Sequence, residues 1–321
     1  MTDADEVLKK GKERKAALEK SLFKQQALPA WRPNPTFLTT LVTFMIFGII
    51  FLVLGLLLFL WGNRIKEAEI TYHITCRKQI EEGAEKCVLD LNIPHKMEAP
   101  VFVYYQIDNL FQNHRRYVRS RSNAQLRGNQ LSVDDVSGDC HPIVTNKHLG
   151  RTTSINNRPL DPDAAAHPCG LIAQSYFNDT FELQKVSAAT PVDINPKGIA
   201  WDTDVSDLFA NMPGDYETYQ WTDVTDERFI VWMRVAGMKN FRKPWGIIHE
   251  DLPEGDYKLT IEDNYPVSSF QGQKKFFMST TDTYGGRNRF LAISYIVVGA
   301  LCIFFALVFL FAFLRQKKKN Q

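Results

Sequence analysis

Apolar residues in this chain are concentrated in two long blocks, Phe37 to Trp61 and Phe290 to Leu314. Each block runs without a charged side chain for longer than the roughly 20 residues that cross the hydrocarbon core of a bilayer as a helix. A helix that is apolar on all sides at this length is typical of a membrane span rather than of a soluble core. The first block is too long for a cleavable signal peptide and follows a mainly polar stretch of 36 residues, so we expect it to stay in place as a signal anchor. The sequence therefore predicts transmembrane helices at 37–61 and 290–314.

The segment between the blocks, residues 62–289, has shorter patterns that are typical of strands. Apolar and polar positions alternate in residues 69–74 and again in residues 257–262. The runs Val101–Ile107 and Phe229–Val235 are rich in β-branched and aromatic residues, which favours buried strands. We predict a mainly antiparallel β domain, resembling a β-sandwich in an α+β molecule, with irregular connections between Gly128 and Pro168.

Charge and topology divide the chain between two sides of the membrane. Two spans place the tail 1–36 and the tail 315–321 on the same side. The two tails carry a net charge of +7 and the segment 62–289 a net charge of −5. Basic residues favour the cytoplasmic side. We expect both tails in the cytoplasm and the inter-helix domain in the lumen or outside the cell.

Cysteine usage supports that orientation. Four of the five cysteines lie in the inter-helix segment, and the fifth, Cys302, lies in the second span. An even number confined to one compartment is typical of disulfides in an oxidising environment, and the spacings fit no zinc site. We therefore expect no metal. Four cysteines allow three pairings, of which we predict the sequential one because local closure is simplest: Cys76–Cys87 and Cys140–Cys169. The same segment contains one glycosylation sequon, at Asn178.

Motifs that would indicate catalysis are missing from the chain. There is no D-K-T-G phosphorylation motif, no Walker A loop, no H-E-x-x-H and no G-x-S-x-G. The triplet His249-Glu250-Asp251 could form an acid/base cluster, but it is better interpreted as a solvated loop. The four arginines between Arg115 and Arg121 indicate a solvated or ion-paired face, since nucleic acid is absent from the lumen. We predict that the chain is not an enzyme, needs no cofactor and binds no nucleic acid.

Small residues recur at intervals of seven in both blocks, at Gly48 and Gly55 and at Ala292, Gly299 and Ala306. A spacing of seven returns to nearly the same helix face, where small side chains let another backbone approach closely. The two helices are therefore expected to pack on each other or on a partner. The alternative is that these residues are simply common in membrane helices. Neither helix has a charged residue or a continuous polar stripe, which disfavours an ion pathway.

Several longer motifs resemble one family, the cell-division-control/ligand-effect-modulator family of flippase β-subunits. The motifs occur in order along most of the chain and are long and rich in aromatic residues. They are Phe23–Trp31, Val103–Asn109, Gln112–Ser120, Pro168–Ala173, Phe177–Thr180, Lys197–Trp201, Ile230–Arg234, Phe241–Lys243, Asn264–Val267 and Gly285–Asn288.

The resemblance implies a non-catalytic partner of a type-4 P-type ATPase α-subunit, which moves phospholipids between membrane leaflets. Such a β-subunit is expected to help the α-subunit fold, leave the endoplasmic reticulum and work in the Golgi, endosomes or plasma membrane. It would contact phospholipids only indirectly. A two-pass channel subunit that oligomerises around its own pore is the alternative. Lys318 and Lys319 form a dilysine pattern that would act as a retrieval signal, or would otherwise only interact with anionic lipid.

Overall fold

The computed structural model describes residues 9–16, 21–25, 28, 36–187, 190–281 and 285–319. It divides into two compact units. One contains the two apolar helices, and we call it the helix pair. The other, Phe59–Arg289, is the inter-helix domain. Parts of the motif Phe23–Trp31 and the last two residues lie outside the described residues.

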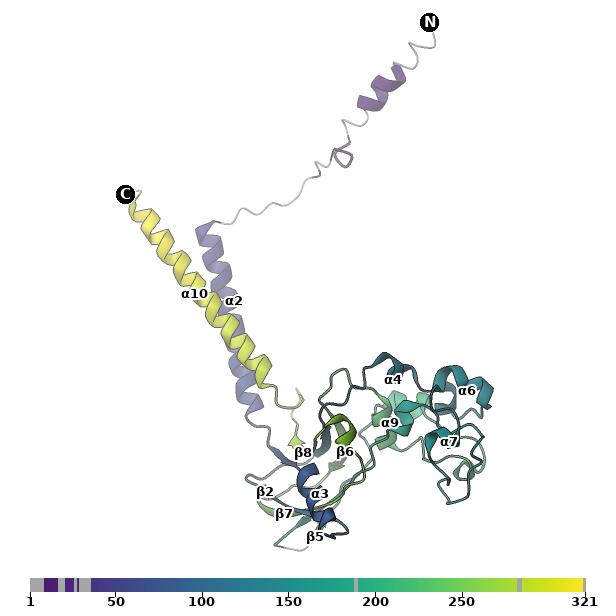
Figure 1. The fold of residues 1–321 in the computed structure, drawn as a ribbon. Helices are drawn as coiled ribbons and strands as arrows, with labels where there is room; N and C mark the ends of the chain where they lie inside the picture. The colour runs from purple at the N-terminus through teal and green to yellow at the C-terminus, as the bar shows by residue number, and fades with distance from the viewer. Residues whose placement is uncertain are drawn as a thin grey trace. The chain divides into compact units, whose positions relative to one another are not determined.

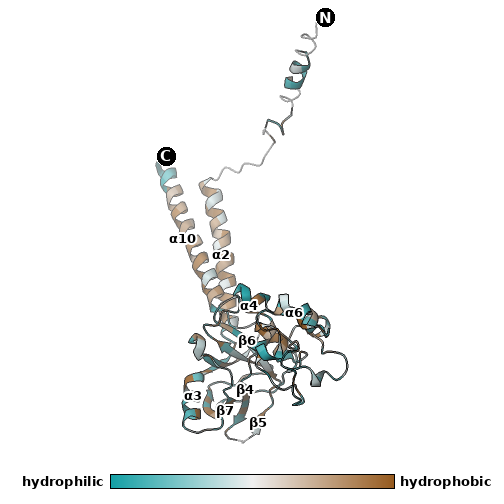
Figure 2. Ribbon diagram, turned by 45° about the vertical axis from the view of Figure 1, so that its right-hand side comes forward, coloured by the Kyte–Doolittle hydropathy of each residue, from teal (hydrophilic) through white to brown (hydrophobic). Residues whose placement is uncertain are grey.

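The helix pair consists of α2 (Phe37–Gly62) and α10 (Arg289–Lys319), which lie side by side (Figure 1). Both are apolar along most of their length, and α10 becomes hydrophilic at its C-terminal end (Figure 2). Only 11% of the most apolar window of each helix is buried, whereas a core helix of a soluble protein would be mostly buried. The two predicted spans are confirmed as helices. The second helix continues beyond the predicted boundary at Leu314, through the basic residues to Lys319.

The inter-helix domain contains two antiparallel sheets of four strands each. One has the order β1-β8-β3-β6 and the other the order β2-β7-β4-β5. The strands within the described residues are β1 (Glu67–Thr71), β2 (Cys87–Ile93), β3 (Val101–Ile107), β4 (Thr180–Lys185), β5 (Thr190–Val192), β6 (Phe241–Ile248), β7 (Gly255–Glu262) and β8 (Lys274–Thr280).

The two sheets share one hydrophobic core. Every second residue of β2 and of β3 is buried, and the buried side chains of both strands belong to the same cluster. Aromatic rings fill much of this core. Tyr105 stacks on Phe177 with ring centroids 3.9 Å apart, and Phe181 contacts the rings of Phe276 and Trp245 edge to face. The sandwich-like β domain predicted from the sequence is therefore confirmed.

Most of the short helices gather on one side of the domain, away from β2, β5 and β7, whereas α3 lies beside β2 (Figure 1). A second, smaller core lies there, around Val136, Cys140, Leu149 and Cys169. This is the region where the sequence indicates irregular connections. The helical elements are α3 (His73–Glu81), α4 (Arg115–Arg119), α5 (Asn123–Leu126), α6 (Val133–Cys140), α7 (Asn146–Leu149), α8 (Leu171–Gln174), η1 (Asp204–Leu208), η2 (Tyr216–Thr218), α9 (Glu227–Met233) and η3 (Ser268–Phe270).

Two of the predicted strands are wrong in part or in whole. The alternation in residues 69–74 continues past the end of β1, because Tyr72 precedes α3 and Ile74 belongs to that helix, with 66% of its surface exposed. The run Phe229–Val235 forms α9 rather than a strand. Six of the seven residues of α9 are buried, so the run shows no polar face and no period of 3.6 residues. Periodicity alone does not separate a buried strand from a buried helix.

Candidate partner interface

The five small residues that the sequence singles out in the helix pair are the buried residues of the two helices. A Cβ added at Gly299 would lie 2.8 Å from the backbone nitrogen of Leu52 and 3.1 Å from the carbonyl oxygen of Gly48. A Cβ added at Gly55 would lie 2.8 Å from the backbone nitrogen of Ile296. The backbones thus approach too closely for any larger side chain, as in other small-residue helix contacts in membranes. Apart from the basic C-terminal end of α10, most of the other side chains of both helices are apolar and exposed or partly exposed.

The inter-helix domain contains two disulfides, Cys76–Cys87 and Cys140–Cys169. These are the pairs expected from the sequence. The first joins α3 to β2, and the second joins α6 to the segment before α8. Asn178, the predicted glycosylation site, is exposed just before β4, so its side chain is accessible to modification.

A buried ion cluster links the two sheets close to Asn178. The side chains of Lys274 and Asp179 are fully buried, and Lys274 Nζ donates to the Asp179 carboxylate at 2.6 Å and also to the Asp263 carboxylate. Asp179 also accepts from the Tyr72 hydroxyl and from the Tyr265 amide, at 2.6 Å each. Burial and the nearby Asp179 carboxylate raise the pKa of Tyr72 well above its usual value. The cluster is a structural element, and its residues were not among those singled out in the sequence.

Two cations hold the C-terminal end of α9. Lys243 Nζ, which is buried, donates to three of the four carbonyls in residues 231–234, at 2.6 to 3.1 Å. Arg121 Nη1 donates to the fourth, that of Met233, at 3.2 Å. Positive charge at a helix C-terminus is favourable because the last carbonyls lack partners within the helix. Burial lowers the pKa of Lys243 to about 7.

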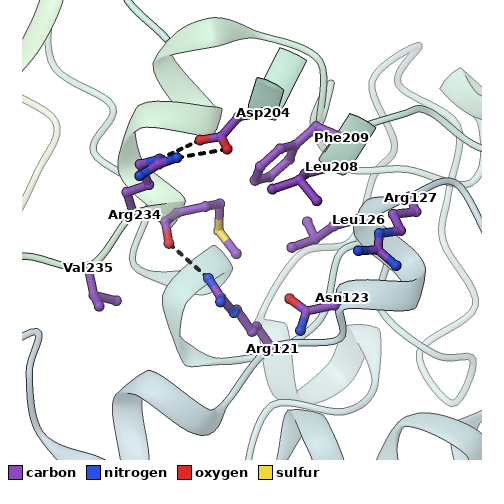
Figure 3. Close-up of a pocket in the computed structure, with 10 residues that line it drawn as sticks. Arg121, Asn123, Leu126, Arg127, Asp204, Leu208, Phe209, Arg234 and Val235 are labelled. Carbon is purple, nitrogen blue, oxygen red and sulfur yellow. Dashed lines mark hydrogen bonds and ion pairs between the residues drawn. The ribbon is translucent and has the colours of Figure 1, made fainter. Parts of the chain in front are cut away.

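A cavity of about 460 Å³ lies beside this helix end, and we call it the arginine pocket. Arg121, Arg127 and Arg234 line it, together with the carboxylate of Asp204 (Figure 3). Arg234 forms a two-pronged ion pair with Asp204, in which its Nη2 donates to Oδ1 at 2.9 Å. Arg127 lies just after α5, and its guanidinium forms no ion pair with any residue that the structure describes. The apolar wall consists of Leu126, Leu208, Phe209, Met233 and Val235.

Sequence reasoning found only part of this pocket. Of the basic run that begins at Arg115, Arg121 alone reaches the cavity. Arg127, Arg234 and Asp204 come from other segments. Arg127 and Asp204 lie in no motif, and Arg234 is the last residue of the family motif Ile230–Arg234. The fold brings these residues together because Arg127 forms a β-bridge with Ala210, just after η1, and η1 in turn contacts α9.

Residues 58–319 match the sequence profile of the LEM3 (ligand-effect modulator 3) family, also called the CDC50 family. The chain belongs to this family. It is 38% identical to cell cycle control protein 50A of Bos taurus, over 91% of this chain and 88% of that protein. It is 36% identical to ALA-interacting subunit 3 of Arabidopsis thaliana, over 93% and 87% of the two chains. A human relative, cell cycle control protein 50B, is 32% identical over 94% of this chain and 95% of its own length.

The family match covers α10, the inter-helix domain and the end of α2. It therefore includes the two disulfides, the buried ion cluster and the arginine pocket.

Proposed function

We propose that the chain is a non-catalytic accessory subunit of a P-type ATPase that moves phospholipids, and that it forms a heterodimer with a type-4 α-subunit. The observation that carries the proposal is membership of the LEM3/CDC50 family, in which plant relatives are named ALA-interacting subunits. The architecture supports it, because two charge-free spans present exposed apolar faces to lipid or to a partner. The chain contains no phosphorylation or nucleotide-binding motif of its own.

In this proposal both tails lie in the cytoplasm and the inter-helix domain lies in the lumen or outside the cell. The disulfides and the exposed sequon at Asn178 support that orientation. The subunit would help the α-subunit to fold, to leave the endoplasmic reticulum and to reach its working state. Its residence would be the endoplasmic reticulum, the Golgi, endosomes or the plasma membrane, according to its partner.

Affinity purification of the tagged full-length chain in mild detergent, followed by mass spectrometry, tests the proposal. We expect one or more type-4 P-type ATPases to co-purify in a near-stoichiometric amount. A tagged membrane protein of similar abundance serves as the control. Recovery of homo-oligomers without any ATPase would contradict the proposal and favour the channel alternative.

Two features would report the orientation and the sorting of the chain. Asn178 should carry a glycan in a host that glycosylates, and an unmodified Asn178 in such a host would argue against a luminal domain. The dilysine pattern of Lys318 and Lys319, at the exposed end of α10, would retrieve unassembled protein. Appending two alanines after Gln321 keeps every charge but shifts the lysines out of register. Release to the Golgi without the partner would support retrieval, and unchanged localisation would leave only attraction to anionic lipid.

A further inference from the structure

We infer that the arginine pocket and the apolar side chains beside it form a docking surface for a loop of the ATPase α-subunit, one that carries a carboxylate next to apolar residues. This inference rests on the proposed function and adds to it the place and the chemistry of one contact. The loop would lie on the same side of the membrane as the inter-helix domain.

The pocket has an excess of positive charge that the domain itself does not neutralise. It is lined by three arginines and one carboxylate, that of Asp204. Asp202 and Asp207, on the same segment as Asp204, are exposed but do not line the cavity. Arg127 is exposed and, within the described part of the chain, has no ion pair. A guanidinium presents five N–H donors, so Arg121 and Arg234 retain donors beyond those they use within the domain.

Two of the three guanidinium groups are held in place before any ligand arrives, and the backbone that carries the third is fixed. The Asp204 side chain is 3% exposed and fixes Arg234, while the Met233 carbonyl fixes Arg121. The segment that carries Arg127 is tied to residue 210, whose amide donates to the Leu126 carbonyl at 2.8 Å. Binding therefore orders few additional side chains, which lowers its entropic cost.

The position after Arg127 needs glycine. Gly128 has a φ of +86°, and a Cβ there would lie 2.7 Å from the carbonyl oxygen of Asn211. The backbone at residue 128 is thus in direct contact with the backbone at residues 210–211. The separation of Arg127 from the η1 segment is therefore set by packed backbone rather than by a loose loop.

An exposed apolar stripe continues from the pocket. Trp201, Val205 and Leu208 are exposed apolar residues that lie just before and along η1, which is a π-helix. Trp201 is 67% exposed, and the guanidinium of Arg234 lies 5.2 Å from the centroid of its ring. Leu208 belongs both to this stripe and to the pocket wall, so the two surfaces are continuous. We call Trp201, Val205 and Leu208 the Trp201 stripe.

Exposed tryptophan beside arginine is the composition of an interface centre rather than of an ordinary solvated surface. Arginine pairs with carboxylate in a planar two-pronged geometry. A free phosphate or a lipid headgroup would satisfy the arginines but would leave Trp201 and Val205 in water. A protein loop with a carboxylate and neighbouring apolar side chains covers both parts of the surface.

Site-specific photo-crosslinking tests the inference in the full-length chain, expressed with the ATPase that co-purifies with it. A benzophenone amino acid replaces Trp201 in one variant and Ile74 in a control variant. Ile74 is 66% exposed, close to the exposure of Trp201, but lies on α3. We expect Trp201 to cross-link to an α-subunit loop that contains Asp or Glu next to apolar residues, at least several-fold more than Ile74 does. Cross-links from Trp201 only to phospholipid, or no α-subunit peptide in an intact complex, would overturn the inference.

Charge reversal provides a second measurement. Arg127→Glu should reduce co-purification of the α-subunit about tenfold, since an attractive pair becomes a repulsive one. Arg158→Glu changes the charge of an exposed arginine outside the pocket and should leave co-purification unchanged. Protease resistance and intact disulfides verify that both variants fold.

The two proposals fail in different ways. If no ATPase co-purifies with the unmodified chain, the proposed function and the docking surface both fall. If the ATPase co-purifies equally with the unmodified chain and Arg127→Glu, and Trp201 gives no cross-link to it, the docking surface alone is wrong.

Discussion

The helix pair and the inter-helix domain are held together by different kinds of contact. In the helix pair, five small residues let two backbones touch, and the apolar blocks 37–61 and 290–314 contain no charge that could form a buried ion pair. The inter-helix domain has a core that contains stacked aromatic rings, and it also has two disulfides and a fully buried lysine–carboxylate cluster. Lipid tails are as apolar as the helices, so helix association in a membrane depends on close packing rather than on the hydrophobic effect. Added volume should therefore be most damaging in the helix pair, and lost partners should be most damaging in the domain.

The largest effect is expected at the buried ion cluster. Lys274→Met would leave the Asp179 carboxylate buried without its cation, which destabilises a protein by about 3–5 kcal/mol. Lys275→Met is the matched control, because Lys275 is partly exposed and pairs with Glu69 at 3.7 Å. Exposed pairs of this kind contribute at most about 1 kcal/mol. Denaturant unfolding of the solubilised chain, followed by tryptophan fluorescence, measures both variants, and equal losses would refute the role of the cluster.

The disulfides should come next. Replacing either pair by serine should cost about 2–4 kcal/mol, with the larger loss for the bridge that closes the longer loop. Cys140–Cys169 spans 29 positions and Cys76–Cys87 spans 11, so removing Cys140–Cys169 should lower stability more. The same unfolding measurement gives the order of the two losses. The reverse order would show that the entropy of the unfolded chain does not determine which disulfide contributes more stability.

In the helix pair, one added methyl group should be enough to separate the backbones. Gly299→Ala would push against the backbone nitrogen of Leu52, at a cost of about 1–3 kcal/mol for overpacking. The native free cysteine supplies the readout, because a Cβ at residue 48 would lie 3.2 Å from the Cβ of Cys302. An added Cβ at residue 48 meets side-chain atoms of Ile303, which can shift, rather than backbone. Gly48→Cys should therefore form a disulfide with Cys302 on oxidation, and adding Gly299→Ala should reduce its yield. Val298→Ile, at an exposed position of α10, is the control and should leave the yield unchanged.

The smallest effect is a pH dependence in the inter-helix domain. Burial lowers the pKa of the His167 side chain below its usual 6.5. Between that lowered pKa and 6.5 the unfolded chain binds more protons than the folded chain, so stability is complete above pH 6.5 and falls as the pH decreases. Unfolding of the wild type and of His167→Gln between pH 7 and pH 5 isolates this contribution. The variant should lose less stability over that range, and identical losses would exclude a role for His167.

The sequence predicted the helix pair better than the domain, for a physical reason. Spans are specified by composition and length, and the seven-residue spacing of Gly48 and Gly55 indicates a face directly. Strands β3 and β7 were also predictable. Strand β3 is a run of β-branched and aromatic residues, and in β7 buried apolar positions alternate with more exposed polar ones. Helix α9 was not, because it is buried all round. Its N-terminal signal was present in Asp226, whose side chain accepts from the Arg228 amide at 3.0 Å.

The arginine pocket and the ion cluster could not be predicted from local patterns. Asp179 and Lys274 are 95 positions apart, and a lysine in a strand is ordinarily expected to face solvent. Arg127 and Asp204 line the same cavity only because residues 126–128 contact residues 210–211, just after η1. Such sites depend on tertiary contacts between distant segments, which periodicity and spacing do not contain.

Reconstitution tests the central claim most directly. The purified full-length chain and its complex with the co-purifying ATPase are placed in liposomes that contain a fluorescent phospholipid, with and without ATP. We expect the chain alone to hydrolyse no ATP and to move no lipid, and the complex to show ATP-dependent transport that the α-subunit without this chain does not sustain. ATP-dependent lipid transport by the chain alone, or full activity of the α-subunit without it, would contradict the account.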